Sequence, residues 1–289
     1  MTIGQLIILA VVQGFAELLP VSSSAHVVVA EKLLGLDPSL PQMMLVLVML
    51  HTGTMFAVIA YFWRQWRRTY FESWATFKRF AGLVILATTL TGIIGEGIIT
   101  VIEKTAIRRA SHAEIEDLFS HLELIAPALA VTGALILIAG IYGKRRLTVR
   151  SAATDELNAK RVGLIGAVQG LCLPFRGFSR SGATISIGML VSVAKSRAEA
   201  FSFALAVVLT PPVLIREALR LVHAGHITGT ANLASAVFSS LLGAVFAFLA
   251  GLVALRWLSR WLEGGRWYFF DIDLLVAAAG VASLHHAGF

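Results

Sequence analysis

The stretch QGFAELLPVSSSAH, residues 13–26, is strongly polar and follows directly on the apolar opening MTIGQLIILAVV. It places a glutamine, a glutamate, three consecutive serines and a histidine around a proline. Non-helical backbone at membrane depth is tolerated only where protein or water satisfies its polar groups. Because the apolar runs on either side are each too short to span a bilayer, residues 2–35 predict a re-entrant hairpin of helix, loop and helix.

The composition is that of an integral membrane protein. Of the 289 residues, 57% are hydrophobic and only 14% are charged, whereas soluble proteins average roughly 25% charged residues. The mean hydropathy of +0.80 also indicates a membrane protein. We therefore predict an all-α polytopic membrane protein with residues 1–289 in a single domain. Six stretches are long enough to span the bilayer: 41–63, 81–102, 123–142, 199–221, 232–255 and 268–287.

The net charge of +7 indicates a membrane surface and not nucleic acid, because the basic residues cluster beside apolar segments. If residues 64–79 face the cytoplasm, alternation also places 143–161, 194–198 and 256–266 there. These four segments hold 16 of the 24 Lys and Arg residues. Since cytoplasmic loops are enriched in Lys and Arg, both termini are predicted to lie outside the cytoplasm.

The chain also repeats itself. VQGFAELLPVSSSAH from Val12 has a counterpart in VQGLCLPFRGFSRSGAT from Val168, so residues 162–194 predict a second re-entrant hairpin. With the charge pattern, this gives an inverted-topology repeat over about 1–142 and 162–289, joined by a cytoplasmic linker at 143–161. In such repeats broken helices meet near the membrane midplane and build a site there.

The second polar break has the features of a phosphate site. A helix N-terminus attracts anions through its free amide groups and its dipole, and an arginine adds a planar bidentate donor. Arg180 lies at such a predicted helix start, and nearby glycines allow close approach of the backbone. The predicted contributors besides Arg180 are Gly177, Ser179, Ser181, Gly182 and Thr184.

The first polar break has the groups that hydrolysis needs. Glu17 and His26 can move protons, and a serine between them can act as nucleophile or bind a water. If Ser23 starts the helix, His26 lies on the same face. The structural alternative is that Ser22–Ser24 and Ser179 cap helices while Glu17 and Arg180 form a buried ion pair.

These residues resemble a known family. QGFAELLPVSSSAH is similar to the first signature block of undecaprenyl-diphosphatases, which also confer bacitracin resistance, and RGFSRSGAT is similar to their second block. The resemblance implies removal of the terminal phosphate of undecaprenyl diphosphate, which renews the lipid carrier for peptidoglycan synthesis. It also implies a bacterial inner-membrane location, a site that opens to the periplasm, and a divalent cation, Mg²⁺ or Ca²⁺.

Carried onto this chain, the resemblance makes Ser23 the nucleophile, Glu17 and His26 its acid and base partners, and Arg180 the phosphate-binding arginine. Glu17 is the candidate metal ligand. Gln13 fills the first motif position, where the family has Glu or Gln, so a metal would have one carboxylate fewer. The remaining substrate-binding candidates are Ser22, Ser24, Gly177, Ser179, Ser181, Gly182 and Thr184.

Several alternatives stay open. Arg176 replaces the proline of the family's second block, as a phosphate contact or a salt-bridge partner. His51 is interpreted as a packed histidine, or one that borders the site. The attacking group is Ser23 or a water activated by Glu17. A lipid-phosphate flippase or anion transporter would share the inverted repeat, while an intramembrane serine protease is disfavoured by Arg180. A homodimer suits a membrane protein of this size.

Overall fold

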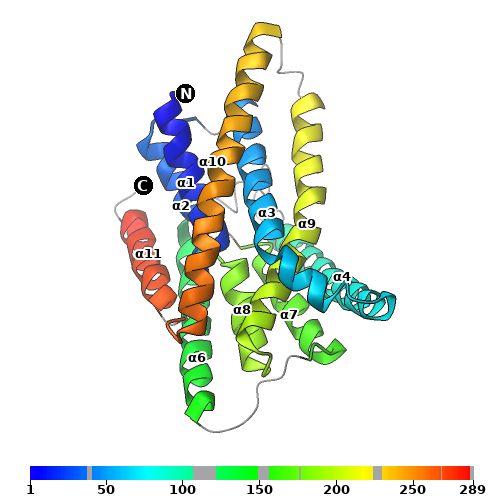
Figure 1. Ribbon diagram of the computed structural model, residues 1–289. Helices are drawn as coiled ribbons and strands as arrows, with labels where there is room; N and C mark the ends of the chain where they lie inside the picture. Colours follow the sequence, from blue (N-terminus) through cyan, green and yellow to red (C-terminus); the bar gives the residue numbers. More distant parts are fainter. Residues whose placement is uncertain are drawn as a thin grey trace. The chain divides into compact units, whose positions relative to one another are not determined.

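The computed structural model describes residues 1–37, 41–106, 122–148, 156–175, 177–223, 230–267 and 269–286. Every regular secondary-structure element within these ranges is a helix, as Figure 1 shows. This confirms the predicted all-α class. The helices are α1 Ile3–Leu18, α2 Ser23–Leu33, α3 Pro41–Thr69, α4 Trp74–Ala106, α6 Leu122–Thr148, α7 Ala159–Cys172, α8 Arg180–Leu190, α9 Lys195–His223, α10 Thr230–Glu263 and α11 Phe269–His286.

Three of the described helices contain segments long and apolar enough to cross a membrane. These segments are Met43–Thr69 in α3, Trp74–Ile102 in α4 and Val237–Glu263 in α10. Shorter apolar helices cover Ile3–Leu18 and Ala126–Tyr142. A helix lies at each of the six predicted spans, but the count of six spanning helices stays a prediction.

Both polar stretches interrupt the helices where the sequence predicts. Leu19 after α1 is extended, with φ −72° and ψ 155°, because a proline pushes the residue before it out of the helical region. The second break lies between Cys172 and Arg180. It includes Gly177 with φ +94°, a left-handed conformation that favours glycine. The helix–loop–helix form is therefore confirmed, while the re-entrant path stays a prediction.

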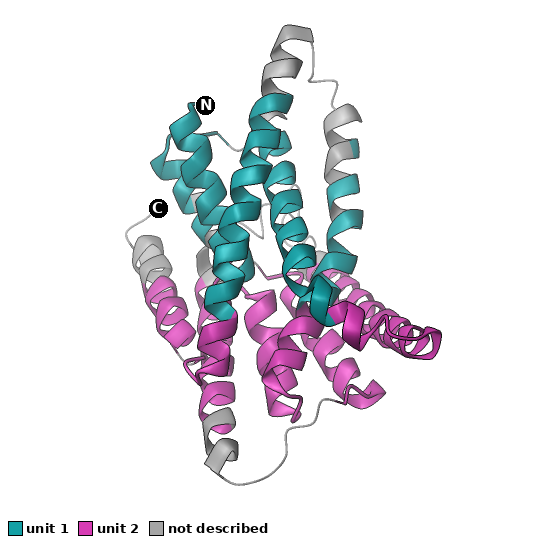
Figure 2. Cartoon of the chain, in the orientation of Figure 1, with its two compact units in different colours: residues 1–19, 23–65, 203–258 teal, residues 20–22, 66–202, 259–289 magenta. Residues whose placement is uncertain are grey.

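The described chain forms two compact units, shown in Figure 2. Unit 1 comprises residues 1–19, 23–65 and 203–258. Its core includes Leu6 and Leu9 of α1, Val46 and Leu50 of α3, and Ala247 of α10. Glycines bring these helices together, because small residues let helix backbones approach closely. Gly14 of α1 packs on Ala250, and Gly53 of α3 packs on the Ala244 carbonyl, so α10 contacts both neighbours.

Unit 2 comprises residues 20–22, 66–202 and 259–289. Its α4 and α7 cross at Gly166, which packs against the backbone of Ala87. The Thr91 hydroxyl donates to the Gly166 carbonyl oxygen over 2.9 Å, and the Gln169 amide donates to Thr91 over 3.2 Å. Each unit draws segments from both predicted repeats. The single domain and its repeat boundaries stay a prediction.

Candidate active site

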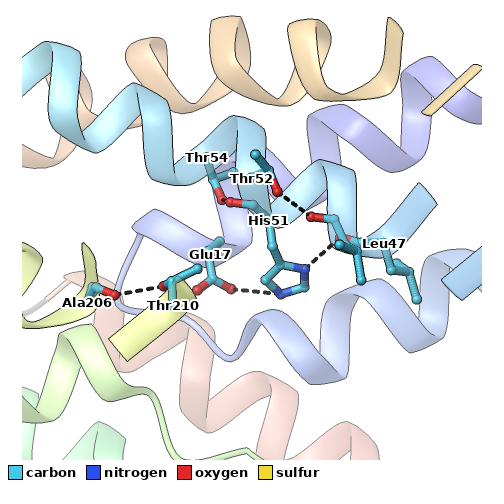
Figure 3. A network of polar contacts seen from close by, with 8 residues as sticks. Glu17, Leu47, His51, Thr52, Thr54, Ala206 and Thr210 are labelled. Carbon is cyan, nitrogen blue, oxygen red and sulfur yellow. Dashed lines mark hydrogen bonds and ion pairs between the residues drawn. The ribbon is translucent and has the colours of Figure 1, made fainter. Parts of the chain in front are cut away.

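Glu17 lies near the end of α1 and meets a side chain from α3. Its Oε2 is 3.7 Å from Nε2 of His51. Figure 3 shows the two side chains pointing toward each other. The other ring nitrogen of His51, Nδ1, lies 2.9 Å from the Leu47 carbonyl oxygen of its own helix. The glutamate side chain is 17% exposed and the histidine side chain 40%. His51 therefore borders the Glu17 carboxylate, which is the alternative that the sequence left open.

Gln13 lies one turn before Glu17 on the same face of α1. Its side chain is only 1% exposed. Neither amide atom has a hydrogen-bond partner among the described residues, although buried polar groups are normally paired. An unpaired buried amide costs about 1–3 kcal/mol. Gln13 thus offers a donor and an acceptor to a polar ligand.

The serines of the first motif fall in different environments. The second helix of the first hairpin, α2, begins at Ser23, as predicted. His26 lies one turn later on the same face of this helix. Both side chains are half-buried. Ser22 is buried in the loop before the helix. The side chain of Ser24 lies outside the described part of the structure, as does Arg176.

The second motif forms the start of α8. Ser179 is its N-cap, and the Ser179 hydroxyl accepts a hydrogen bond from the Gly182 amide over 3.3 Å. The capping alternative is therefore confirmed for this serine. Arg180 follows as the first helical residue and is half-buried. Its charge and the positive end of the helix dipole together favour an anion here.

Three contacts hold α8 to other elements of unit 2. The Ser179 amide donates to the Thr132 hydroxyl of α6 over 3.3 Å. The Thr184 hydroxyl lies 2.5 Å from that of Ser202 in α9. Trp267, just before α11, donates its indole hydrogen to the Ser186 hydroxyl over 3.1 Å. These contacts fix the direction of α8 and hence the place of Arg180 at its start.

Thr184 is fully buried, and its hydroxyl also lies 2.7 Å from the Arg180 carbonyl oxygen, to which it can donate. A hydroxyl has one hydrogen to donate, and a phosphate oxygen needs a donor. The geometry therefore suits Thr184 to holding α8. Its predicted contact with substrate stays a prediction, as does that of the buried Ser181.

The two motifs meet where the Pro20 turn of the first packs against Gly182 in the first turn of α8. A Cβ placed on Gly182 would lie 3.2 Å from Cβ of Pro20 and 2.8 Å from Cδ1 of Ile136. Pro20 belongs to the first motif and Gly182 to the second, although 162 positions separate them along the chain. Unit 2 thus contains the turn of one motif packed against the helix start of the other.

Metal ligands are sparse. No group of three or more His, Cys, Asp or Glu side chains that could hold an ion occurs within the described ranges. The Glu17 and His51 pair is a two-residue set, and Gln13 adds an unpaired amide oxygen on the same helix as Glu17. Such a set fits a cation that keeps waters and takes its other ligands from a phosphate substrate.

The sequence did not assign roles to Thr132, Ser202 or Trp267. The only signal for the first two is a hydroxyl inside an apolar helix, and that signal is weak because such hydroxyls often bond within their own helix. Thr132 does so as well, donating to the Ala128 carbonyl oxygen over 2.9 Å. Their contacts with α8 depend on distant segments of chain.

A family model described as bacitracin resistance protein BacA matches residues 6–280 of the chain. This protein belongs to the BacA family. An undecaprenyl-diphosphatase 2 of Acinetobacter baylyi is 52% identical over 280 residues, which is 96% of both chains. An undecaprenyl-diphosphatase of Rhodopirellula baltica is 30% identical and covers 92% of this chain and 91% of its own. An undecaprenyl-diphosphatase 2 of Burkholderia thailandensis is 32% identical and covers 98% and 96%.

Membership of the BacA family confirms the resemblance drawn from the two motifs. The matched region contains both polar breaks and all but the ends of the helical chain. With its apolar helices, this BacA-family chain is a multi-pass membrane protein.

Proposed function

We propose that this protein hydrolyses undecaprenyl diphosphate to undecaprenyl phosphate and inorganic phosphate, and so recycles the lipid carrier for peptidoglycan synthesis. The observation that carries the proposal is the packing of the Pro20 turn of the first motif against Gly182 at the start of α8 in the second. It joins a capped, arginine-bearing helix start to the Pro20 turn of the first motif. The names of the similar proteins in three bacteria support the same reaction.

In this mechanism Arg180 and the amides that start α8 bind the terminal phosphate. They neutralise the charge that spreads over its oxygens as the phosphoryl group transfers. Ser22, Ser24, Gly177, Ser181 and Gln13 are the further proposed substrate contacts. Ser179 contributes by capping the helix.

Ser23 is the proposed nucleophile. A bond forms from its oxygen to the terminal phosphorus while the bond to the undecaprenyl phosphate oxygen breaks, and His26 or Glu17 takes the serine proton. Water then releases phosphate from the serine. In the alternative route Glu17 activates a water that attacks directly, and Ser23 only binds substrate.

A divalent cation, Mg²⁺ or Ca²⁺, is part of the proposal. The Glu17 carboxylate is the ligand, and Gln13 lies on the same helix face with its amide oxygen unpaired. When bound, the ion would neutralise charge on the diphosphate oxygens. The residues themselves orient the substrate and move the protons.

The proposed membrane arrangement has six spanning helices and two re-entrant hairpins in an inverted repeat. The support comes from the helix breaks after Leu18 and Cys172 and from the loop charges. Both termini and the opening of the active site then face the periplasm across the inner membrane. A homodimer is the oligomeric state to test, by light scattering in detergent.

The test is phosphate release from undecaprenyl diphosphate by purified protein in detergent, with EDTA and with added Mg²⁺ or Ca²⁺. Glu17→Ala and Arg180→Ala should each lower turnover by about 10²–10³-fold, because each removes a charge that acts in the transition state. Ser23→Ala should abolish turnover if the serine is the nucleophile, whereas substantial residual turnover would indicate attack by water.

Arg79→Ala is the matched control. Arg79 pairs with Glu156 over 2.7 Å, and both side chains are exposed, so its loss should leave turnover intact. No phosphate release from a folded preparation that still binds the lipid phosphate would favour a flippase or anion carrier instead.

A further inference from the structure

The orientation of His51 is set by its own helix. A carbonyl oxygen only accepts hydrogen bonds, so the contact of 2.9 Å with Leu47 requires a hydrogen on Nδ1, which donates. In the neutral ring the lone pair is then on Nε2. That nitrogen lies 3.7 Å from the Glu17 carboxylate; Figure 3 shows it on the side of the ring that faces Glu17.

The Glu17 carboxylate oxygen and the His51 Nε2 atom therefore direct two lone pairs into the space between them. A carboxylate oxygen and an imidazole lone pair repel each other unless a cation lies between them, either a proton or a metal ion. Both groups are standard metal ligands. The side chains are 17% and 40% exposed, so an ion can reach them.

The spacing of the pair is built into unit 1. Glu17 lies three residues after Gly14, which packs on Ala250 of α10. His51 lies two residues before Gly53, which packs on the Ala244 carbonyl of the same helix. Because α10 contacts both glycines, α1 and α3 cannot separate without opening at least one tight contact with α10. Ligand positions fixed by the scaffold are what a metal site needs.

We propose that Glu17 and His51 together bind one divalent cation, and that the nitrogen ligand makes the site prefer Mn²⁺ to Ca²⁺. Ca²⁺ takes oxygen ligands almost exclusively, whereas imidazole suits transition metals, among which Mn²⁺ also accepts carboxylate and water. The inference deepens the proposed function by naming a second protein ligand. It rests on that function only for the part the ion plays in turnover.

Binding is measured without substrate. Metal-free protein in detergent is titrated with Mn²⁺, and the electron paramagnetic resonance signal of free Mn²⁺ reports what remains unbound. Wild type should bind one Mn²⁺ per chain. His51→Ala and Glu17→Gln should each weaken that binding by about tenfold or more. In competition, half of the bound Mn²⁺ should be displaced from wild type only when free Ca²⁺ is about tenfold higher in concentration than free Mn²⁺. His51→Ala should lose this preference for Mn²⁺.

Two variants guard against a trivial result. Thr52→Ala changes the neighbouring residue, whose hydroxyl donates to the Val48 carbonyl of the same helix, and should bind Mn²⁺ as wild type does. His51→Gln keeps a polar side chain and replaces His51→Ala if that variant does not fold. Unchanged Mn²⁺ binding in a folded His51 variant, or no binding by wild type, would overturn the proposal.

Phosphate release by the same preparations separates this proposal from the proposed function. If wild type releases phosphate but the His51 variants bind Mn²⁺ as tightly as wild type, the metal pair is refuted and the phosphatase activity is supported. The expected binding pattern without turnover supports the metal pair and refutes the phosphatase.

Discussion

Gly182 occupies a position where a single methyl group decides the packing. A Cβ there would lie 2.8 Å from Ile136 and 3.2 Å from Pro20, closer than carbon atoms pack in protein interiors. The glycine is thus required by its neighbours, whereas its backbone is ordinary helix. The residue that lets the turn of the first motif pack against the helix start of the second is one without a side chain.

We predict that Gly182→Ala destabilises the protein by about 1–3 kcal/mol, because the methyl group forces Pro20 or Ile136 to move. Phosphate release should fall with it, since the start of α8 carries Arg180. Thermal unfolding in detergent and turnover assays measure the two effects.

Gly163 in α7 provides the matched control. A Cβ there would meet Leu90 at 3.5 Å, an ordinary contact. Gly163→Ala should therefore keep activity and gain up to about 1 kcal/mol from the better helix propensity of alanine. Equal stability and turnover in the two variants would refute a packing role for Gly182.

At the scale of elements, α8 is held from three sides by single polar contacts. Thr132 comes from α6, Ser202 from α9 and Trp267 from the turn before α11. The first contact lies at the N-cap, and Thr184 and Ser186 lie two residues apart on nearly opposite faces of the helix, so together the contacts set its rotation. In an apolar environment such directional bonds specify an arrangement that apolar packing alone leaves open.

Trp267→Phe should cost about 1 kcal/mol of stability, because it removes the indole donor and leaves the buried Ser186 hydroxyl with one partner fewer. If the contact positions α8, kcat should fall while KM changes less. Ser186→Ala alone and together with Trp267→Phe completes a double-mutant cycle. A coupling energy near zero in that cycle would show that the bond contributes nothing.

At the scale of the whole molecule, the distribution of charge predicts the orientation in the membrane. The segments predicted to be cytoplasmic hold 16 of 24 Lys and Arg residues, and such loops resist translocation. Exposed positions on both predicted sides are available for labelling. Thr2 caps the start of α1, and Glu156 lies ahead of α7.

Cysteine labelling tests the orientation. In a Cys172→Ser background, which removes the only native cysteine, Thr2→Cys should react with a membrane-impermeant maleimide in intact cells whose outer membrane admits the reagent. Glu156→Cys should react only after the inner membrane is permeabilised. The Glu156 side chain is exposed, so losing its ion pair should cost little. The reverse labelling pattern would invert the proposed topology.

Local sequence determined the helices and their breaks. Apolar runs predicted the helical segments, and Pro20 and Ser179 marked the turn and the cap because their effects act within a few residues. The similarity of the two V-Q-G stretches was also visible in the sequence. The role of the shared glycine was not visible there. The structure shows that Gly14 and Gly170 are both sites of close helix contact.

The partners of the motif residues were decided by tertiary structure alone. His51 meets Glu17, and Thr132 meets Ser179, across 34 and 47 positions of chain. Which side chain faces a helix depends on how its neighbours are rotated, and a shift of one residue turns a helical side chain by about 100°. The apolar pattern of a helix that is hydrophobic all round does not specify that rotation. The glycine contacts on α10 and the polar bonds to α8 do.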